Sequence, residues 1–254
     1  MSVSRPVLIG IAGPSASGKS TVAEKAQQKF GDECLVLSAD RYYKSLDLPT
    51  VAERAAPSKD IPEAIDFDLL VKHVNQLLLR ETIDAPLYSF GSHKRYLRTQ
   101  KIDPAEVKFI IVESILVFCH DDLVNLFDKK IFVNTDPDVC LARRILRDIN
   151  ERQRQADGVI KQYMETVRPA LMDHILPSIK HADLVITNNE TVLNPRDAEI
   201  DMDSVYDLIN KPVVPGTASN TGMFSSFGYD PRIAHPASLS QVPVYTVGGF
   251  KRGK

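Results

Sequence analysis

The sequence has few cysteines, and no two of them lie close together in the chain. Cys34, Cys119 and Cys140 are the three cysteines of the 254-residue chain, and they lie far apart with no C-x-x-C pair. An odd number of widely separated cysteines argues against a disulfide framework and against a zinc site built on cysteine. We expect all three to be reduced thiols in the core.

Long hydrophobic runs and an excess of charge of one sign are also missing. No apolar stretch approaches the length of a membrane span, and residues 1–6 lack the pattern of a signal peptide. The net charge of −2 gives no general attraction to nucleic acid or to an acidic membrane surface. We therefore expect a cytoplasmic protein whose partners include neither nucleic acid nor membrane.

Glycine and serine gather in one short segment. Residues 13–20 read Gly-Pro-Ser-Ala-Ser-Gly-Lys-Ser, a complete G-x-x-x-x-G-K-[ST] phosphate-binding loop, with an apolar run before it and a helical pattern after it. In that context backbone N–H groups surround phosphate oxygens, and the helix N-terminus adds a favourable dipole. We predict that a nucleoside triphosphate binds at Gly13, Pro14, Ser15, Ala16, Ser17, Gly18, Lys19, Ser20 and Thr21.

Short apolar runs alternate with longer helical patterns. They predict five strands, at residues 7–12, 35–37, 109–112, 131–133 and 184–186. Because these runs are apolar at successive positions, we expect an α/β fold with a mainly parallel sheet and helices on both faces. Ligands of such sheets bind beyond the carboxyl ends of the strands, where Asp40 and Glu113 stand.

Helical spacing and composition divide the rest of the chain. Helices are predicted over residues 67–80, 136–155, 159–181 and 202–210, with Asp136 as N-cap of the second and Pro169 and Pro177 kinking the third. After Lys211 the sequence becomes rich in proline, glycine and serine. We expect a P-loop catalytic domain over residues 1–211 and an irregular C-terminal tail over 212–254.

Two acids and a lysine fit the needs of phosphoryl transfer to an alcohol. Such a reaction requires a clamped triphosphate, a magnesium ion, a base beside the acceptor hydroxyl and positive charge over the transferred group. Lys19 would reach the outer phosphates, Asp40 would accept the hydroxyl proton, and Glu113 would face Ser20 across the magnesium ion. Either acid alone could also be a solvated loop residue or a helix cap.

Arginine is concentrated in residues 141–154. Leu141, Ile145 and Ile149 recur every four residues and predict a buried stripe, which leaves the arginines on other faces. A helix rich in i,i+4 ion pairs, such as Arg144 with Asp148, would look similar. With a phosphate loop upstream, the better interpretation is an arginine-bearing lid that closes over the phosphates.

Other nucleotide-binding classes are excluded by motifs that the sequence lacks. A GTPase would carry an N-K-x-D base-reading motif, and the nearest string, residues 210–213, has no aspartate. An L-S-G-G-Q-like signature of transport ATPases is also missing. Kinases of small metabolites remain.

Several strings in order resemble the uridine kinase (uridine-cytidine kinase) family. They are residues 10–13 with 15–20, Asp40 with 42–44, 86–90 with His93, Glu113 with 115–116, 143–152, 162–163, 167–169 and 181–186. The resemblance runs from about residue 7 to 187. It implies transfer of the γ-phosphate of ATP or GTP to the 5′-hydroxyl of uridine or cytidine, with Mg²⁺, commonly by a homotetramer.

The resemblance also implies roles for individual residues. Asp40 corresponds to the general base, and Ser20 and Glu113 to the neighbours of the magnesium ion. Arg147 and Arg152 would face the phosphates. The nucleoside would be bound by Tyr43, Asp60, Tyr88, His93, Arg144, Arg154 and Gln162.

The chain departs from the family pattern at four places. Lys59 replaces an aromatic residue before Asp60, Ser114 and Gln153 replace glycines, and residues 187–189 lack the usual Pro-Arg-Gly. Two alternatives therefore stay open. One is a kinase of the same scaffold that acts on nicotinamide riboside or on a sugar phosphate, as phosphoribulokinase does. The other is a catalytically weakened nucleotide-binding protein with a regulatory role.

Overall fold

The computed structural model describes residues 5–45, 48–55, 58–190 and 200–213. The predicted tail over 212–254 lies outside the described residues from position 214 onward. The boundary at residue 211 therefore stays a prediction, and the fold below is that of the preceding body.

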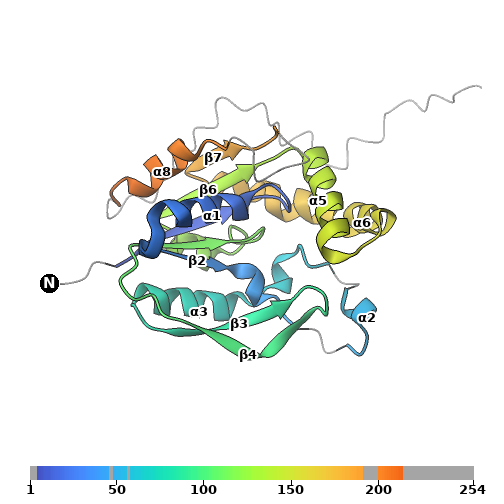
Figure 1. Cartoon of the computed structure of the whole chain (residues 1–254), viewed down its shortest axis with the longest axis horizontal. Coiled ribbons are helices and arrows are strands. Elements are labelled where there is room, and N and C mark those ends of the chain that lie inside the picture. Colours follow the sequence, from blue (N-terminus) through green and yellow to red (C-terminus); the bar gives the residue numbers. More distant parts are fainter. Residues whose placement is uncertain (1–4, 46–47, 56–57, 191–199, 214–254) are drawn as a thin grey trace, which may run out of the picture. The chain divides into compact units, whose positions relative to one another are not determined.

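A five-stranded parallel sheet forms the centre of this body (Figure 1). The strands follow the order β2-β5-β1-β6-β7, and every pairing among them is parallel. Their bounds are β1 Val7–Ala12, β2 Cys34–Ser38, β5 Phe109–Glu113, β6 Lys129–Asn134 and β7 Leu184–Thr187. The five strands predicted from the apolar runs are confirmed, as is the α/β class.

Successive side chains of the strands enter two separate hydrophobic clusters, as the two-residue repeat of a strand requires. Ile9 and Ile11 pack with α1 (Lys19–Phe30) and α8 (Met202–Asn210). Leu8 and Val112 pack on the opposite face with α3 (Phe67–Leu78) and α4 (Asp121–Leu126). Both faces of the sheet are therefore covered, and α3 and α8 lie on opposite sides of the strands (Figure 1).

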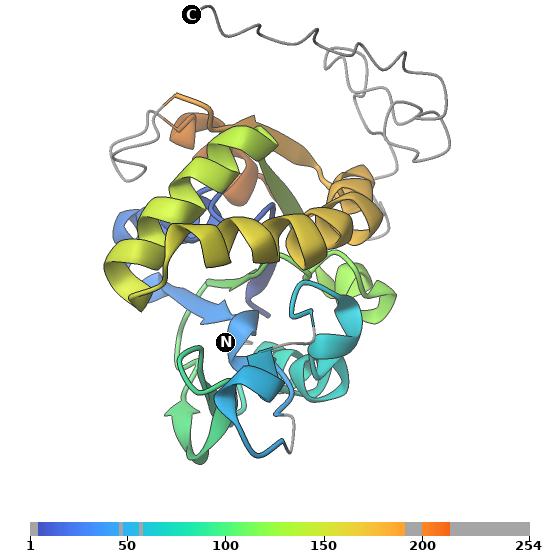
Figure 2. The same cartoon turned by 90° about the vertical axis from the view of Figure 1, so that its right-hand side faces the viewer.

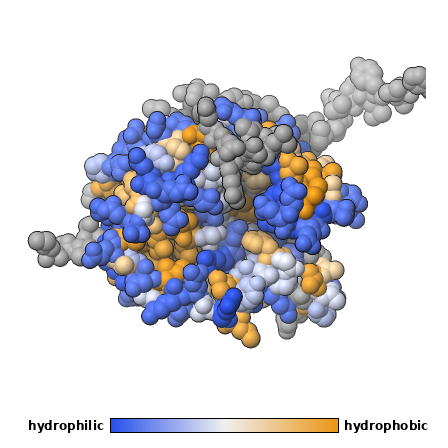
Figure 3. Space-filling view, viewed as in Figure 1, coloured by the Kyte–Doolittle hydropathy of each residue, from blue (hydrophilic) through white to orange (hydrophobic). Residues whose placement is uncertain are grey.

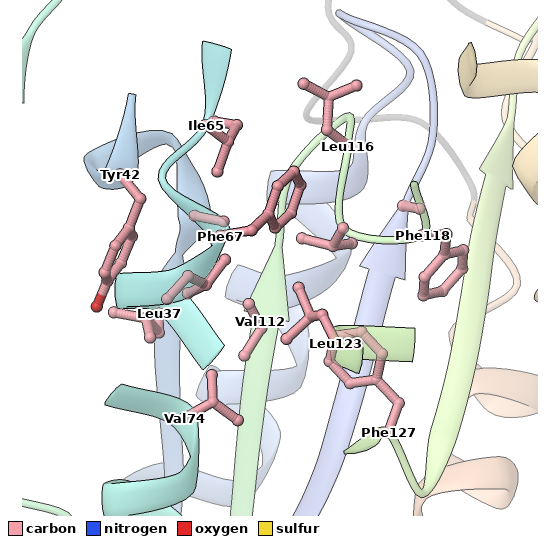
Figure 4. Packing of buried hydrophobic residues seen from close by; sticks show 14 of the residues in the cluster. Leu37, Tyr42, Ile65, Phe67, Val74, Val112, Leu116, Phe118, Leu123 and Phe127 are labelled. Carbon is pink, nitrogen blue, oxygen red and sulfur yellow. The ribbon is translucent and has the colours of Figure 1, made fainter. Parts of the chain in front are cut away.

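The cluster on the α3 face is the larger of the two and reaches toward the carboxyl edge of the sheet. Figure 4 shows Val112 of β5 surrounded by side chains from α3, such as Phe67 and Val74, and from the segment after β5. Tyr42, from the short turn after β2, closes this cluster and is fully buried. The turn that carries Asp40 is thereby anchored in the core.

Most predicted helices are present, with small differences at their ends. The helix predicted over residues 67–80 is α3, and α8 spans the residues predicted for it. The arginine-rich helix α5 (Pro137–Arg152) begins after Asp136 as predicted but ends three residues before position 155. It stops because Gln153 adopts a left-handed conformation with φ 53°, where the family usually has glycine.

The third predicted helix is a composite of short helical segments. The chain stays helical from Ala156 to His181, but π turns lie on both sides of Pro169. Proline lacks an N–H and crowds the preceding turn, so wider hydrogen-bonding turns accommodate it. The segments are α6 Ala156–Gln162, η4 Tyr163–Val167, α7 Arg168–Ala170, η5 Leu171–Ile175 and η6 Leu176–His181.

An antiparallel hairpin was not predicted. Strands β3 (Ile83–Ser89) and β4 (Lys94–Ile102) pair outside the main sheet, with a bulge between Pro86 and Tyr88. Most of β4 is exposed and polar, so its sequence shows neither an apolar run nor an alternation. The other short elements are η1 Gly31–Glu33, η2 Ala39–Tyr42, α2 Val51–Ala55 and η3 Pro62–Ala64.

The prediction of a buried stripe in α5 is wrong. Ile149 is 40% exposed, and the residues that α5 buries are Cys140, Arg143, Arg144 and Asp148. This face is charged, so a pattern based on hydrophobic periodicity selects the wrong side of the helix. These charged side chains can be buried because they have hydrogen-bond and ionic partners, which are described below.

The surface agrees with a compact body of this kind. The face seen in Figure 3 is largely hydrophilic, with smaller hydrophobic patches between the polar groups. None of the helices in the described part of the chain is both long enough and apolar enough to cross a bilayer.

Gly10 offers a test of the packing. A Cβ at this position would lie 2.7 Å from Cε1 of Phe118 and 2.9 Å from the Phe127 ring, and both rings are buried. Gly10→Ala should therefore lower the free energy of unfolding by about 1–3 kcal/mol, measured by denaturant titration.

Gly158→Ala is the matched control. Gly158 lies in α6, and a Cβ there would meet no atom within 4 Å. Alanine in an open helical position should be neutral or stabilise by up to about 1 kcal/mol. Equal effects of the two substitutions would contradict the described packing around β1.

Candidate active site

The phosphate loop is a closed turn between β1 and α1. Gly13 and Gly18 have φ angles of 150° and 99°, which side chains with a Cβ rarely adopt. A Cβ on Gly13 would collide with the carbonyl oxygen of Val133, so the loop lies against the end of β6. The Lys19 side chain is buried beside it. A glycine-lined cradle of this shape with a buried cation fits a phosphate group.

The strand register brings both predicted acids to this loop. Glu113, the last residue of β5, pairs with Ile11 of β1 on one side and with Ser38 of β2 on the other. Ser20 Oγ donates to Glu113 Oε2 at 3.1 Å. Asp40 follows Ser38 within η2, on the same edge of the sheet. The two predicted acids therefore stand at the carboxyl ends of two paired strands, Glu113 on β5 and Asp40 just after β2.

Ser114 supplies a contact that the sequence did not reveal. Its Oγ donates to Asp40 Oδ1 at 2.7 Å, and the residue is almost fully buried. The family usually has glycine here, and a glycine could not make this bond. One oxygen of Asp40 is thus held in place, which orients the carboxylate.

The environment of Glu113 is both buried and charged. Burial raises the pKa of Glu113, the Lys19 ammonium acts against this, and the nearby Asp40 carboxylate adds to it. Among the described residues no three His, Cys, Asp or Glu side chains form a cluster that could hold a metal. Ser20 and Glu113 alone fit Mg²⁺, which usually takes few protein ligands and completes its shell with water and phosphate oxygens.

Three aromatic rings line the hairpin side of the site. Tyr43 and Tyr88 have ring centroids 5.3 Å apart, and Phe90 lies 6.0 Å from Tyr43 and 5.3 Å from Tyr88. The guanidinium of Arg152, at the end of α5, lies 5.0 Å above the Phe90 ring. This cation–π contact joins the arginine helix to the hairpin.

Arg95 of β4 fastens the turn that carries Asp40. Its Nη2 donates to the Tyr42 carbonyl at 2.7 Å, and its Nε donates to the Tyr43 carbonyl at 2.9 Å. Its Nη1 pairs with Asp66, the N-cap of α3, at 3.0 Å. No sequence pattern indicates this role, because the exposed and polar β4 carries no strand signal.

The arginines of the predicted lid surround one buried acid. Asp148 has no exposed surface, and it pairs with Arg147 at 2.9 Å, Arg152 at 3.3 Å and Arg154 at 3.0 Å. Burial alone would raise the pKa of Asp148, but the charges of Arg147 and Arg152 outweigh it and hold this pKa below its usual value. Asp148 therefore keeps three guanidinium groups close together despite their repulsion.

A small pocket lies between the phosphate loop and the arginine helix. Arg144 donates from Nη1 to Ser15 Oγ at 3.2 Å and from Nη2 to Gln162 Oε1 at 3.3 Å. Arg154 donates to the same Gln162 oxygen at 2.7 Å. Asp60 lines the pocket with Ser15 and Arg144. Burial raises the pKa of Asp60, and the Arg144 charge opposes this shift.

Figure 2 looks onto the edge of the body at which the strands of the main sheet end. The helices α5 and α6 lie on one side, and the blue and cyan segments with residues 39–45, 48–55 and 58–66 lie on the other. The structure thus gathers most of the residues that the resemblance selected. His93 lies in the turn between β3 and β4 with φ 52°, and Thr21 lies half-buried in α1. The roles assigned to these residues stay predictions.

The Asp148 cluster generates a prediction on stability. Asp148→Asn removes the negative charge from among three arginines and should lower the free energy of unfolding at pH 7 by about 2 kcal/mol. This is below the value for a fully buried pair, because each arginine is about one-third exposed. The loss is measured by denaturant titration across pH.

The pH dependence has a defined sign. A carboxylate with a depressed pKa stabilises the fold above its unfolded pKa of about 3.9 and loses that contribution as pH falls further. The difference between wild type and Asp148→Asn should therefore shrink below about pH 4. Glu165→Gln, which breaks an exposed i,i+4 pair with Lys161, is the control and should change stability by less than about 0.5 kcal/mol. A pH-independent difference would contradict the ionic role of Asp148.

Comparison with known proteins agrees with this geometry. The family model described as "Phosphoribulokinase / Uridine kinase family" matches residues 8–194. A uridine kinase of Clostridium botulinum (strain Okra / Type B1) is 45% identical over 183 residues, which cover 72% of this chain and 88% of that protein. A uridine kinase of Geobacillus kaustophilus is 44% identical over 72% of this chain and 86% of that protein.

A solved structure supports the fold. The phosphoribulokinase of Rhodobacter spheroides superposes with a TM-score of 0.55 at 16% identity, over 78% of this chain and 76% of that one. At that identity the likeness concerns the architecture alone. The family match, the identity to curated uridine kinases and the phosphate loop lead to one conclusion: the chain is a P-loop phosphotransferase of the phosphoribulokinase/uridine kinase family.

Proposed function

We propose that the chain transfers the γ-phosphoryl group of ATP or GTP to the 5′-hydroxyl of uridine or cytidine, a step of pyrimidine salvage. The observation that carries this proposal is the arrangement of Ser15, Asp60 and Arg144 around one pocket beside the phosphate loop, with Gln162 hydrogen-bonded to Arg144. The identity of 45% to a protein named uridine kinase supports it.

The phosphate loop and Lys19 bind the triphosphate. The loop offers backbone N–H groups, and the buried Lys19 ammonium offers one concentrated positive charge near the outer phosphates. Ser20 and Glu113 would hold Mg²⁺, which when bound neutralises negative charge on the phosphate oxygens. Arg147 and Arg152, kept near each other by Asp148, supply further positive charge from the lid.

The chemical step is a direct displacement. Asp40 accepts the proton of the acceptor hydroxyl as that oxygen forms a bond to the γ-phosphorus. The bond between the γ-phosphorus and the bridging oxygen of the donor breaks, and the nucleoside diphosphate leaves. Ser114 fixes one oxygen of Asp40 and leaves the other for the acceptor. No covalent phosphoenzyme is required.

The acceptor side offers polar and aromatic groups suited to a nucleoside. Asp60 is a buried carboxylate able to accept hydrogen bonds from ribose hydroxyls, as the resemblance implies. Tyr88 and His93 would contact the base, and Tyr43 adds a ring beside Tyr88. Arg144, Arg154 and Gln162 would make further contacts to the nucleoside or within the lid. A homotetramer and a cytoplasmic location remain expectations from the resemblance and the sequence.

Lys59 favours a second candidate. It lies next to Asp60, is half-buried, and burial lowers its pKa. A cation at this place suits an acceptor that carries an anionic group, such as a sugar phosphate. A phosphoribulokinase-like reaction is therefore the alternative to nucleoside phosphorylation.

An acceptor panel tests the proposal. The wild-type chain is assayed with Mg²⁺ and either ATP or GTP against uridine, cytidine, nicotinamide riboside and ribulose 5-phosphate. We expect kcat/KM for uridine or cytidine to exceed the other acceptors by at least about tenfold. Preference for ribulose 5-phosphate would favour the alternative, and tight ATP binding without turnover of any acceptor would favour a regulatory protein.

Asp40→Asn tests the general base. Asparagine keeps the shape but cannot accept the proton, so kcat should fall by on the order of 10² to 10⁴ with nucleotide affinity within about twofold of wild type. Asp32→Asn is the control, because Asp32 is an exposed acid before the opposite end of β2. Wild-type turnover by Asp40→Asn would remove Asp40 from the mechanism.

A further inference from the structure

A buried asparagine from the end of the sheet supports the phosphate loop from beneath. Asn188 directly follows β7, in the segment where this chain lacks the Pro-Arg-Gly of the family, and it is 2% exposed. Its Nδ2 donates to the backbone carbonyl of Ser17 at 2.7 Å. Thr135, after β6, places its Oγ1 3.1 Å from the same carbonyl oxygen and 3.2 Å from the carbonyl oxygen of Asn188, so its one proton is shared between the two acceptors. Two donors from neighbouring strand ends thus converge on one carbonyl of the loop.

This contact fixes the orientation of the peptide group between Ser17 and Gly18. The Ser17 carbonyl and the Gly18 N–H belong to one planar trans peptide and point in opposite directions. With the carbonyl held toward Asn188 and Thr135, the Gly18 N–H is directed away from these two side chains. Phosphate oxygens are bound by N–H groups directed in this way. A flip of the same peptide would present a carbonyl oxygen to an anion.

Arg143 determines which end of the Asn188 amide faces Ser17. Its Nη2 donates to Asn188 Oδ1 at 3.3 Å, and the arginine is itself 2% exposed. A guanidinium has donors only, so the amide oxygen must face Arg143 and the amide nitrogen must face the carbonyl. Arg143, on the buried side of α5, thereby links the arginine helix to the underside of the loop.

Gly18 provides the space for this amide. A Cβ at residue 18 would overlap Asn188 Nδ2, and the φ of 99° is itself unfavourable for other residues. The glycine of the motif and the asparagine after β7 therefore fit together as a pair. The amide fills the volume that the missing side chain leaves open.

We propose that Asn188 is a positioning residue for the donor nucleotide: its amide holds the Ser17–Gly18 peptide so that the Gly18 N–H faces the triphosphate. The inference rests on the proposed function only in that the loop binds a triphosphate, and it holds for any acceptor. Its effect is on affinity for the donor, whereas Asp40 acts on the transfer step.

Two neighbouring asparagines allow a matched test. Asn188→Asp replaces the donor Nδ2 by an acceptor oxygen, so the Ser17 carbonyl loses this donor and is repelled by the new oxygen, with only Thr135 left as a partner. Asn189 uses its Oδ1 to accept from the Asp136 N–H at 2.9 Å, and aspartate at 189 keeps that bond. Both variants add one negative charge at adjacent positions. The two native residues differ in their hydrogen bonds. The Asn188 amide donates to the Ser17 carbonyl of the loop, whereas the Asn189 side chain accepts from Asp136.

The readout is the dissociation constant of Mg–ATP, measured by calorimetry without acceptor and well below each variant's Tm. We expect Asn188→Asp to weaken binding by about tenfold or more and Asn189→Asp to stay within about twofold of wild type. With ATP saturating, the KM for the acceptor should be unchanged in Asn188→Asp. A loss that only reflected instability would not separate the two substrates in this way.

Thr135→Val supplies a second, uncharged variant of similar shape. It removes the other donor to the Ser17 carbonyl and should weaken ATP binding by about threefold to tenfold. If Asn188→Asp fails to fold, this variant decides, and wild-type affinity in it overturns the proposal. ATP binding by Asn188→Asp equal to that of Asn189→Asp also overturns it. Normal ATP binding by wild type with no acceptor turnover would refute the nucleoside kinase function and leave this inference standing.

Discussion

The parallel pairing of β5 between β1 and β2 is the constraint on which the site depends. This register ends three strands at one edge, so the phosphate loop, Glu113 and the turn with Asp40 meet without any long connection. Apolar packing on both faces fixes the register, because a shift of one residue would exchange the two hydrophobic clusters. The positions of the acids are therefore consequences of how the core packs.

The elements predicted well from the sequence are those with a strong local or hydrophobic signal. The five strands are continuous apolar runs, and the phosphate loop is an eight-residue motif, so neither needs knowledge of distant contacts. Strand β4 is exposed and polar, so the sequence does not predict it. The contacts of Arg95 on this strand could not be predicted for the same reason. Contacts such as Ser114 with Asp40 join positions 74 residues apart, and no local pattern specifies such a pair.

The arginine helix shows why hydrophobic periodicity can fail beside a functional site. Its apolar residues at intervals of four predicted one buried face, but the structure buries Arg143, Arg144 and Asp148 instead. These charges are tolerated because each has partners: Asn188, Ser15 with Gln162, and three arginines. Ile149, left half in solvent, is a consequence of turning the charged face inward. The side of α5 that faces inward is therefore determined by hydrogen bonds and ion pairs, whereas other helices turn their apolar side inward.

The support of the phosphate loop from beneath also bears on biosynthesis. The bond from Asn188 to the Ser17 carbonyl joins residues 171 positions apart in the chain. A nascent chain that ends before β7 can contain the whole loop and still lack this bond. The loop in its described form is therefore completed only after all five strands of the sheet have left the ribosome, and bound nucleotide can stabilise the chain through this contact only from that stage onward.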